Sequence, residues 1–300
     1  MGHNHAHSHS PAARNKGRLA IVLGLTATYL VAEGVAGWWT NSLALLADAG
    51  HMLADVAGLG LALLAIHFAG RPATPERTYG YYRVEILAAL INAVVLLGIS
   101  GLILYEAYER FRNPPPVASG PMLVVAVIGL GVNIAGMLLL HAGAGESLNI
   151  KGAYFEVLSD ALGSLGVIVA AVVIWATRWY YADPLISAAI GLFILPRTWG
   201  LLSEAVHVLL EGTPAGLDLA AVRAVISGID GVVDVHDLHA WSLTTGVNAL
   251  SAHVVLDGSA SPGDVLTEVH RRVTADFPIG HATIQVEPEG WAGEEGEYHL

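Results

Sequence analysis

The sequence predicts an α-helical membrane protein with six transmembrane helices, followed by a C-terminal cytoplasmic α+β domain. Three observations lead to this fold class. The chain of 300 residues is 54% hydrophobic and 13% charged, far from the make-up of an ordinary water-soluble protein. Its first two thirds divide into apolar stretches of about 20 residues, the length that crosses a bilayer. Its last third alternates short strand-like and helix-like segments instead.

The six apolar stretches are separated by polar turns or by loops that contain proline and glycine. Only Thr40, Asn41 and Ser42 stand between the first and the second, which predicts a tight helical hairpin. The predicted spans are residues 19–39, 43–69, 86–105, 122–141, 153–175 and 184–202.

The distribution of basic residues predicts the orientation, because Lys and Arg are enriched on the cytoplasmic side of membrane proteins. Both termini are therefore expected in the cytoplasm, and an even number of spans agrees. No cleaved signal peptide is expected, and the compact layout favours a bacterial inner (plasma) membrane. The cytoplasmic set is Arg14, Lys16, Arg18, Arg71, Arg77, Arg83 and Lys151, against Arg110, Arg112 and Arg178 on the other side.

The C-terminal third predicts the order αββαβ, from residues 218–227, 232–243, 248–256, 262–277 and 282–286. This order suits an open sheet with two helices on one face. From residue 212 onward the sequence has thirteen acidic residues and only three arginines. This excess of negative charge argues against nucleic acid and favours a cation as partner. We expect four parts: residues 1–17, 18–211, 212–288 and 289–300.

Both ends of the chain are polar and are predicted to be disordered. The N-terminal tract has alternating histidines that are suited to loose metal capture, and the C-terminal tail is acidic. The chain has no cysteine, so any metal must be held by nitrogen and oxygen ligands. The histidines of the tract are His3, His5, His7 and His9.

Two predicted spans carry ionisable residues on one helix face. Asp48, His51 and Asp55 follow the spacing i, i+3 and i+7 in the second span, and Glu156 and Asp160 lie one turn apart in the fifth. An ionisable group inside a span costs several kcal/mol unless it faces a partner or a water-filled cavity, so these groups indicate a functional site. Glu33 in the first span is a further acid that can line the path or take protons.

If the two faces meet, His51, Asp55, Glu156 and Asp160 supply one imidazole and three carboxylates, enough for a four-coordinate zinc-like site. The acids exceed the charge of one dication, and protons can take the metal's place on them. The alternative is that the acids pair with a basic residue in the membrane. Arg197, which follows Pro196, is the nearest candidate, and we interpret it as too close to the cytoplasm to neutralise the set.

Four motifs resemble the cation diffusion facilitators, specifically the branch that exports zinc, cobalt and cadmium. They are SLALLADAGHMLAD (42–55), RPATPERTYGYYRVE (71–85), KGAYFEVLSDALG (151–163) and HVLLEGTP (207–214). The resemblance implies a homodimer that exchanges divalent metal for protons by alternating access, with a ferredoxin-like cytoplasmic domain. It maps the transport site onto the same four residues of the second and fifth spans. Many zinc carriers of this family have His where this chain has Glu156, so cobalt or cadmium is expected to pass beside zinc.

The C-terminal domain has three strand motifs rich in metal-ligand side chains, VHDLHAWSL, SAHVVL and HATIQVE. The resemblance points to His236, His253 and Glu287 as ligands of a regulatory zinc site, with His239, His281 and Gln285 as additional members. For each histidine taken alone, an ordinary surface or turn position is an equally good interpretation.

Two other classes of function remain to be distinguished from transport. An intramembrane metalloenzyme is disfavoured, because the sequence has neither an HExxH helix nor a candidate nucleophile. A membrane metal sensor would explain the C-terminal ligands but not the ligands in two spans. We therefore predict a transporter and not an enzyme, and flux into sealed vesicles separates the three classes.

Overall fold

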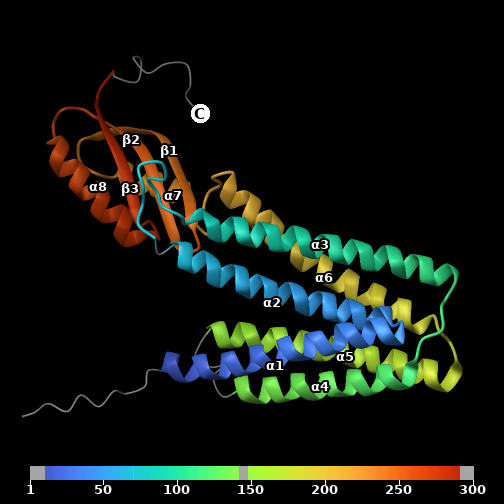
Figure 1. Ribbon diagram of the computed structural model, residues 1–300. Coiled ribbons are helices and arrows are strands. Elements are labelled where there is room, and N and C mark those ends of the chain that lie inside the picture. Colours follow the sequence, from blue (N-terminus) through green and yellow to red (C-terminus); the bar gives the residue numbers. More distant parts are fainter. Residues whose placement is uncertain (1–10, 70, 142–147, 291–300) are drawn as a thin grey trace, which may run out of the picture. The chain divides into compact units, whose positions relative to one another are not determined.

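The computed structural model describes residues 11–69, 71–141 and 148–290 (Figure 1). The predicted histidine tract and nearly all of the acidic tail lie outside these residues. The chain forms two compact units. One unit consists of Met1–Leu61 and Ile91–Leu201, and the other of Ala62–Leu90 and Leu202–Leu300.

Six long helices make up the first two thirds of the chain, as predicted: α1 (Pro11–Thr40), α2 (Leu43–Ala69), α3 (Arg83–Arg112), α4 (Ser119–His141), α5 (Leu148–Thr177) and α6 (Ala182–Leu209). Within the described residues, five are long and apolar enough to cross a membrane. The sixth, α2, is 27 residues long and carries the ionisable stripe. Most of the helices run past the predicted apolar stretches, because backbone hydrogen bonding continues into polar residues.

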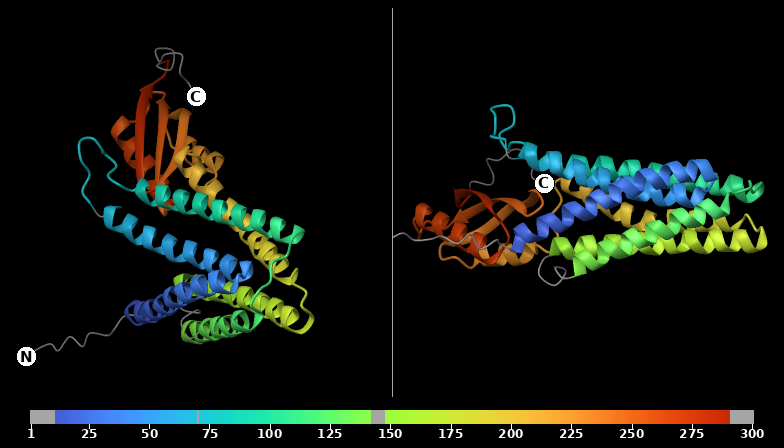
Figure 2. Two further views of the ribbon diagram at one scale, coloured as in Figure 1. Left: turned by 45° about the vertical axis from the view of Figure 1, so that its right-hand side comes forward. Right: turned by 60° about the horizontal axis from the view of Figure 1, so that its bottom comes forward.

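The first unit is held together by close packing of small residues. Helices α1, α4 and α5 lie side by side (Figures 1 and 2), and a buried cluster of mostly small apolar side chains joins α1, α2, α4, α5 and α6. At Gly136 a Cβ atom would lie 3.2 Å from Val157 Cγ1, so the backbones of α4 and α5 approach closely. Large apolar side chains such as Leu102, Leu138 and Trp175 are exposed, as expected of a surface that faces lipid.

The start of α2 is capped by an acid from another helix. Asp183, which is fully buried on α6, accepts hydrogen bonds from Ser42 Oγ (2.6 Å) and from the backbone N–H of Leu43 (2.8 Å). Arg110 Nη1 lies 3.7 Å from Asp183 Oδ2. The carboxylate satisfies backbone donors that a helix start leaves open, and it is favoured there by the helix dipole. Further along α6, Pro196 stands inside the helix.

The C-terminal domain has the predicted αββαβ order: α7 (Leu219–Ser227), β1 (Val232–Thr244), β2 (Val247–Leu256), α8 (Pro262–Asp276) and β3 (His281–Pro288). The sheet order is β1-β2-β3, with β1 antiparallel and β3 parallel to the central β2 (Figure 1). Helices α7 and α8 contact each other and bury Val222, Ile226 and Val269 against the sheet. A parallel neighbour of β2 requires the crossover that α8 provides.

The second unit also includes the loop before α3 and the first residues of that helix. Arg83 Nη2 lies 2.6 Å from Glu211 Oε1, and the Glu85 carboxylate accepts a hydrogen bond from the Thr244 hydroxyl at the end of β1. Tyr79 packs edge-on against His281, with ring centroids 6.3 Å apart. Side-chain contacts therefore join this loop to the sheet.

Candidate metal centre

Three of the four predicted membrane ligands converge. His51 Nε2 lies 3.5 Å from Asp55 Oδ2 on α2 and 3.8 Å from Asp160 Oδ1 on α5. One ligand atom from each of the three residues lies within 4.8 Å of the other two. We call these three residues the helix cluster. His51 and Asp55 share a face of α2 because they are four residues apart.

The helix cluster has the chemistry of a cation site. His51 and Asp160 are buried, and Asp55 Oδ2, Asp160 Oδ1 and His51 Nδ1 make no hydrogen bond within the described residues. One imidazole and two carboxylates suit a borderline divalent ion such as Zn²⁺, which binds nitrogen and oxygen at about 2.0–2.2 Å. Ligand atoms 3.5–3.8 Å apart can surround one such ion with little movement. Three protein ligands leave a fourth position open.

Glu156 takes a different partner from the one predicted. Both of its carboxylate oxygens accept hydrogen bonds from Arg197 on α6, with Nη1–Oε1 at 2.9 Å and Nη2–Oε2 at 2.6 Å. The interpretation that Arg197 is too close to the cytoplasm to neutralise the acids is therefore wrong for Glu156. The guanidinium reaches it because a long, flexible side chain extends well beyond its own turn of helix. That Glu156 binds metal stays a prediction.

Asp48 also lies apart from the helix cluster, although it shares the stripe on α2. Its Oδ2 accepts a hydrogen bond from Ser164 Oγ at 3.4 Å, and Asn133 Nδ2 on α4 donates to the same hydroxyl at 3.3 Å. Asp48 is almost completely buried. It belongs to a polar network one helical turn from His51.

The predicted ligands of the C-terminal domain also come together. His253 Nδ1 on β2 lies 2.9 Å from Glu287 Oε1 on β3, and His236 Nε2 on β1 lies 3.5 Å from Glu287 Oε2. His236 and His253 are directly opposite in the antiparallel pair, which brings the two side chains close on one face. Glu287 reaches the same face from β3, where it is opposite Val255, two residues from His253.

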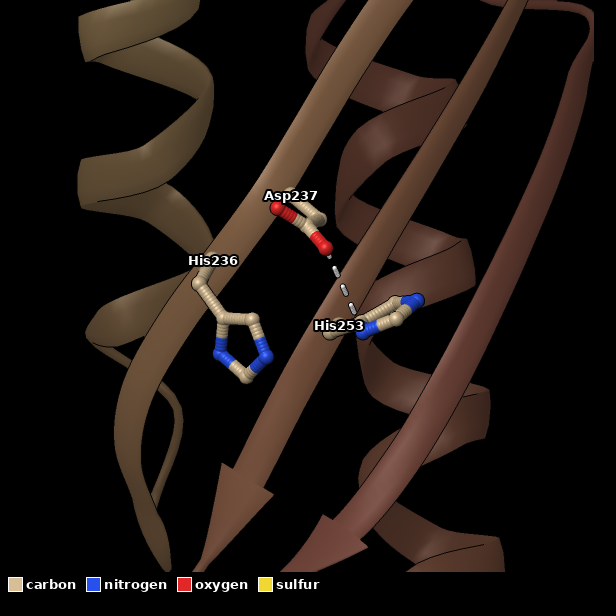
Figure 3. A group of neighbouring side chains, drawn as sticks. All are labelled: His236, Asp237 and His253. Atoms are coloured by element: carbon tan, nitrogen blue, oxygen red, sulfur yellow. Dashed lines mark ion pairs between the residues drawn. The ribbon is translucent and has the colours of Figure 1, made fainter. Parts of the chain in front are cut away.

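Asp237 joins this group, although the sequence did not predict it. Its Oδ2 lies 3.9 Å from His253 Nδ1, and it stands with His236 and His253 in Figure 3. Strand alternation would point Asp237 away from its neighbour His236. The backbone has φ of 44° at Asp237 and a register shift between His236 and His239, and this irregularity turns the carboxylate to the ligand side. We call His236, Asp237, His253 and Glu287 the strand cluster.

The structure does not bring the other predicted histidines into the strand cluster. His239 is exposed and is opposite Ser251, while His281 is exposed at the start of β3 against Tyr79. Gln285 lies beside the cluster, where its Nε2 donates to Glu287 Oε1 at 2.8 Å. It can orient that carboxylate without binding metal itself.

Comparisons with known proteins agree with both halves of this architecture. The family model for the cation efflux transmembrane domain matches residues 19–210, which include all of α2, and the model for the cytoplasmic domain of cation efflux proteins matches residues 214–289.

Several curated relatives match over nearly the whole chain. The cation efflux system protein CzcD of Alcaligenes sp. is 50% identical over 96% of this chain and 90% of its own length. The cadmium, cobalt and zinc/H(+)-K(+) antiporter of Bacillus subtilis is 42% identical over 96% of this chain and 93% of its own. The zinc transporter ZitB of Escherichia coli is 43% identical over the same shares. The chain therefore belongs to the cation efflux family, the cation diffusion facilitators, as its sequence motifs predicted.

Proposed function

We propose that this chain exports divalent transition-metal cations, zinc first and cobalt or cadmium beside it, in exchange for protons. The observation that carries the proposal is the convergence of His51, Asp55 and Asp160 from two apolar helices. Buried ionisable groups inside membrane helices are characteristic of ion and proton pathways. The names of the relatives in Alcaligenes, Bacillus and Escherichia support the choice of cargo.

Competition for the same side chains provides the exchange. A carboxylate and an imidazole bind metal only when they are deprotonated, so protons that reach the helix cluster displace the ion, and the ion displaces protons. Access from alternate sides of the membrane then converts this competition into transport. His51 supplies the group whose ordinary titration range is nearest to physiological pH.

The proposed orientation, membrane and oligomeric state are those that the sequence predicts. Both termini face the cytoplasm, the membrane is a bacterial inner membrane, and the working form is a homodimer. The positive-inside distribution of Lys and Arg supports the orientation. The match to the cation efflux cytoplasmic domain supports the homodimer.

The strand cluster is proposed to be a regulatory zinc site. His236, His253 and Glu287, with Asp237, offer two nitrogens and two carboxylates from all three strands. A metal that binds one conformation of the dimer more tightly than another shifts the population toward it, so this cluster can report cytoplasmic metal to the transporter.

The test is uptake of zinc, cobalt and cadmium into proteoliposomes that carry a proton gradient. Asp55→Ala and Asp160→Ala are expected to abolish gradient-dependent flux. Ser159→Ala is the matched control, because among the described residues this hydroxyl on α5 donates a hydrogen bond only to the backbone carbonyl of Phe155 on its own helix. If wild type binds metal but carries no flux, the chain is a metal sensor instead. If wild type carries no flux but turns over a substrate, the chain is a metalloenzyme instead.

A further inference from the structure

The carboxylate of Glu156 lies beside the helix cluster without belonging to it. Glu156 and Asp160 are four residues apart on α5, so they share a face of the helix, with Cβ atoms about 5–6 Å apart. Among the described residues of the membrane helices, the ligand atoms that converge to within 4.8 Å belong to His51, Asp55 and Asp160. A potential fourth ligand is therefore present one helical turn from the site.

Arg197 on α6 holds both oxygens of this carboxylate. Its Nη1 donates to Glu156 Oε1 at 2.9 Å and its Nη2 to Oε2 at 2.6 Å. Both residues lie inside predicted spans, where an ion pair is screened less than at a water-facing surface. A metal that binds Glu156 must approach the guanidinium that already holds it, against the repulsion between two positive charges.

The guanidinium leaves the two acids of the helix cluster available. Within the described residues, no Arg or Lys forms an ion pair with Asp55 or Asp160. Asp55 Oδ2 and Asp160 Oδ1 are buried and make no hydrogen bond in this part of the chain. Of the three acids near His51, two therefore keep an oxygen that can bind metal, and the third is held by arginine.

This division decides the ligand chemistry that a cation meets. With the ion pair in place, the site offers one imidazole nitrogen and two carboxylates. With Glu156 released, it would offer one imidazole and three carboxylates. Carboxylate oxygens suit hard dications such as Mn²⁺ and Mg²⁺, whereas imidazole suits Zn²⁺. A third carboxylate would therefore favour the hard ions more than zinc.

We propose that Arg197 withholds Glu156 from the metal and thereby keeps the helix cluster selective for zinc over oxygen-preferring dications such as Mn²⁺. Arg197 is a positioning residue, because it acts through Glu156 and not by touching the ion. The cation is bound by three protein ligands, in contrast to the four that the sequence predicts. The inference rests on the proposed transport function and identifies what restricts its cargo.

The experiment compares dissociation constants for zinc and manganese in the full-length protein in detergent. All variants carry His253→Ala, which removes the strand cluster from the measurement, and binding that Asp55→Ala abolishes defines the helix cluster. Arg197→Gln is expected to lower the preference for zinc over manganese by about tenfold, because the freed carboxylate favours the harder ion. Both ions carry two charges, so a change in local charge cancels in this ratio, and structural damage weakens both.

The double variant Arg197→Gln, Glu156→Gln is expected to restore the original preference, because it has no third carboxylate to offer. Glu156→Gln alone is expected to leave the preference unchanged, and this measurement does not depend on the folding of any Arg197 variant. Arg112→Gln is the matched control, because it removes the same charge at the end of α3, where the guanidinium lies over Tyr108.

Two results would overturn the proposal. An unchanged preference in Arg197→Gln would show that the ion pair does not set selectivity. A shift toward zinc in Glu156→Gln alone would show that this carboxylate already binds metal in the presence of Arg197. Failure of the transport proposal is seen separately, as zinc binding with the expected preference but without flux in proteoliposomes.

Discussion

Arg197 binds Glu156 through two parallel hydrogen bonds, at 2.9 and 2.6 Å, one to each carboxylate oxygen. This bidentate geometry is the strongest that an arginine and a carboxylate form. The acid therefore has a partner before any metal arrives. A metal that uses Glu156 as its fourth ligand must take it from the guanidinium, and a metal bound by three ligands leaves the ion pair in place.

Replacement of Arg197 by Gln is expected to tighten zinc binding to the helix cluster by about tenfold, which corresponds to 1.4 kcal/mol. The substitution removes a positive charge that repels the metal and frees Glu156 to become a ligand. Isothermal titration in detergent measures the change. Arg178→Gln, beyond the far end of α5, serves as the control, and weaker binding by Arg197→Gln would show that the ion pair supports the site instead of competing with it.

Asp183→Asn is expected to lower the thermal unfolding temperature by several degrees, because a buried hydrogen bond left unmade costs about 1–3 kcal/mol. Ser42 and the backbone N–H of Leu43 donate to different carboxylate oxygens, and the amide keeps only one acceptor oxygen, so one of these two hydrogen bonds is lost. Unfolding in detergent monitored by tryptophan fluorescence gives the readout. Glu204→Gln, at an exposed acid of the same helix, should leave the temperature unchanged.

His253→Ala is expected to remove about one zinc ion per chain, because this imidazole contacts both carboxylates of the strand cluster, Asp237 and Glu287. Asp237→Ala should weaken the same site by about 10–100-fold, the usual cost of losing a supporting ligand. Metal content after dialysis against a weak chelator measures both. His239→Ala and His281→Ala are matched controls that lie outside the cluster, and zinc loss in either would contradict the observed grouping.

Gly163→Ala is expected to destabilise the helical unit, because the new methyl group would lie 2.5 Å from Asp48 Oδ1. Gly131→Ala provides the matched comparison, since nothing lies within 4 Å of its added methyl on α4. The control should be as stable as wild type or slightly more stable, because Ala is a better helix former than Gly by about 1 kcal/mol. Equal unfolding temperatures for the two variants would contradict this packing argument.

Periodicity was enough to predict the helix cluster, whereas the resemblance to the cation diffusion facilitators pointed to most of the strand cluster. Spacing along α2 and α5 places acids on one face of each helix, and the cost of burying them makes those faces meet. Strand pairing likewise brings His236 and His253 together, since the two strands are joined by a short turn around Gly246, which has φ of 75°.

The features that the sequence did not predict depend on geometry finer than periodicity. Arg197 was interpreted as too close to the cytoplasm because of where its backbone lies in α6. Its long side chain nevertheless extends to Glu156 on α5. Asp237 was not predicted, because a local bulge cannot be seen in a pattern of alternating residues. The only sequence signal for Asp237 as a ligand was that it directly follows His236.

Pro196 affects how α6 can move. Proline has no backbone N–H, so the carbonyl of Leu192 lacks its normal helical partner, and two residues later the Thr198 hydroxyl adds a hydrogen bond to the carbonyl of Ile194 at 3.0 Å. Both features make a helix easier to bend. Arg197, which binds Glu156, lies between Pro196 and Thr198, where the helix bends most easily. A small change in the bend of α6 at Pro196 would move the Arg197 guanidinium toward or away from α5.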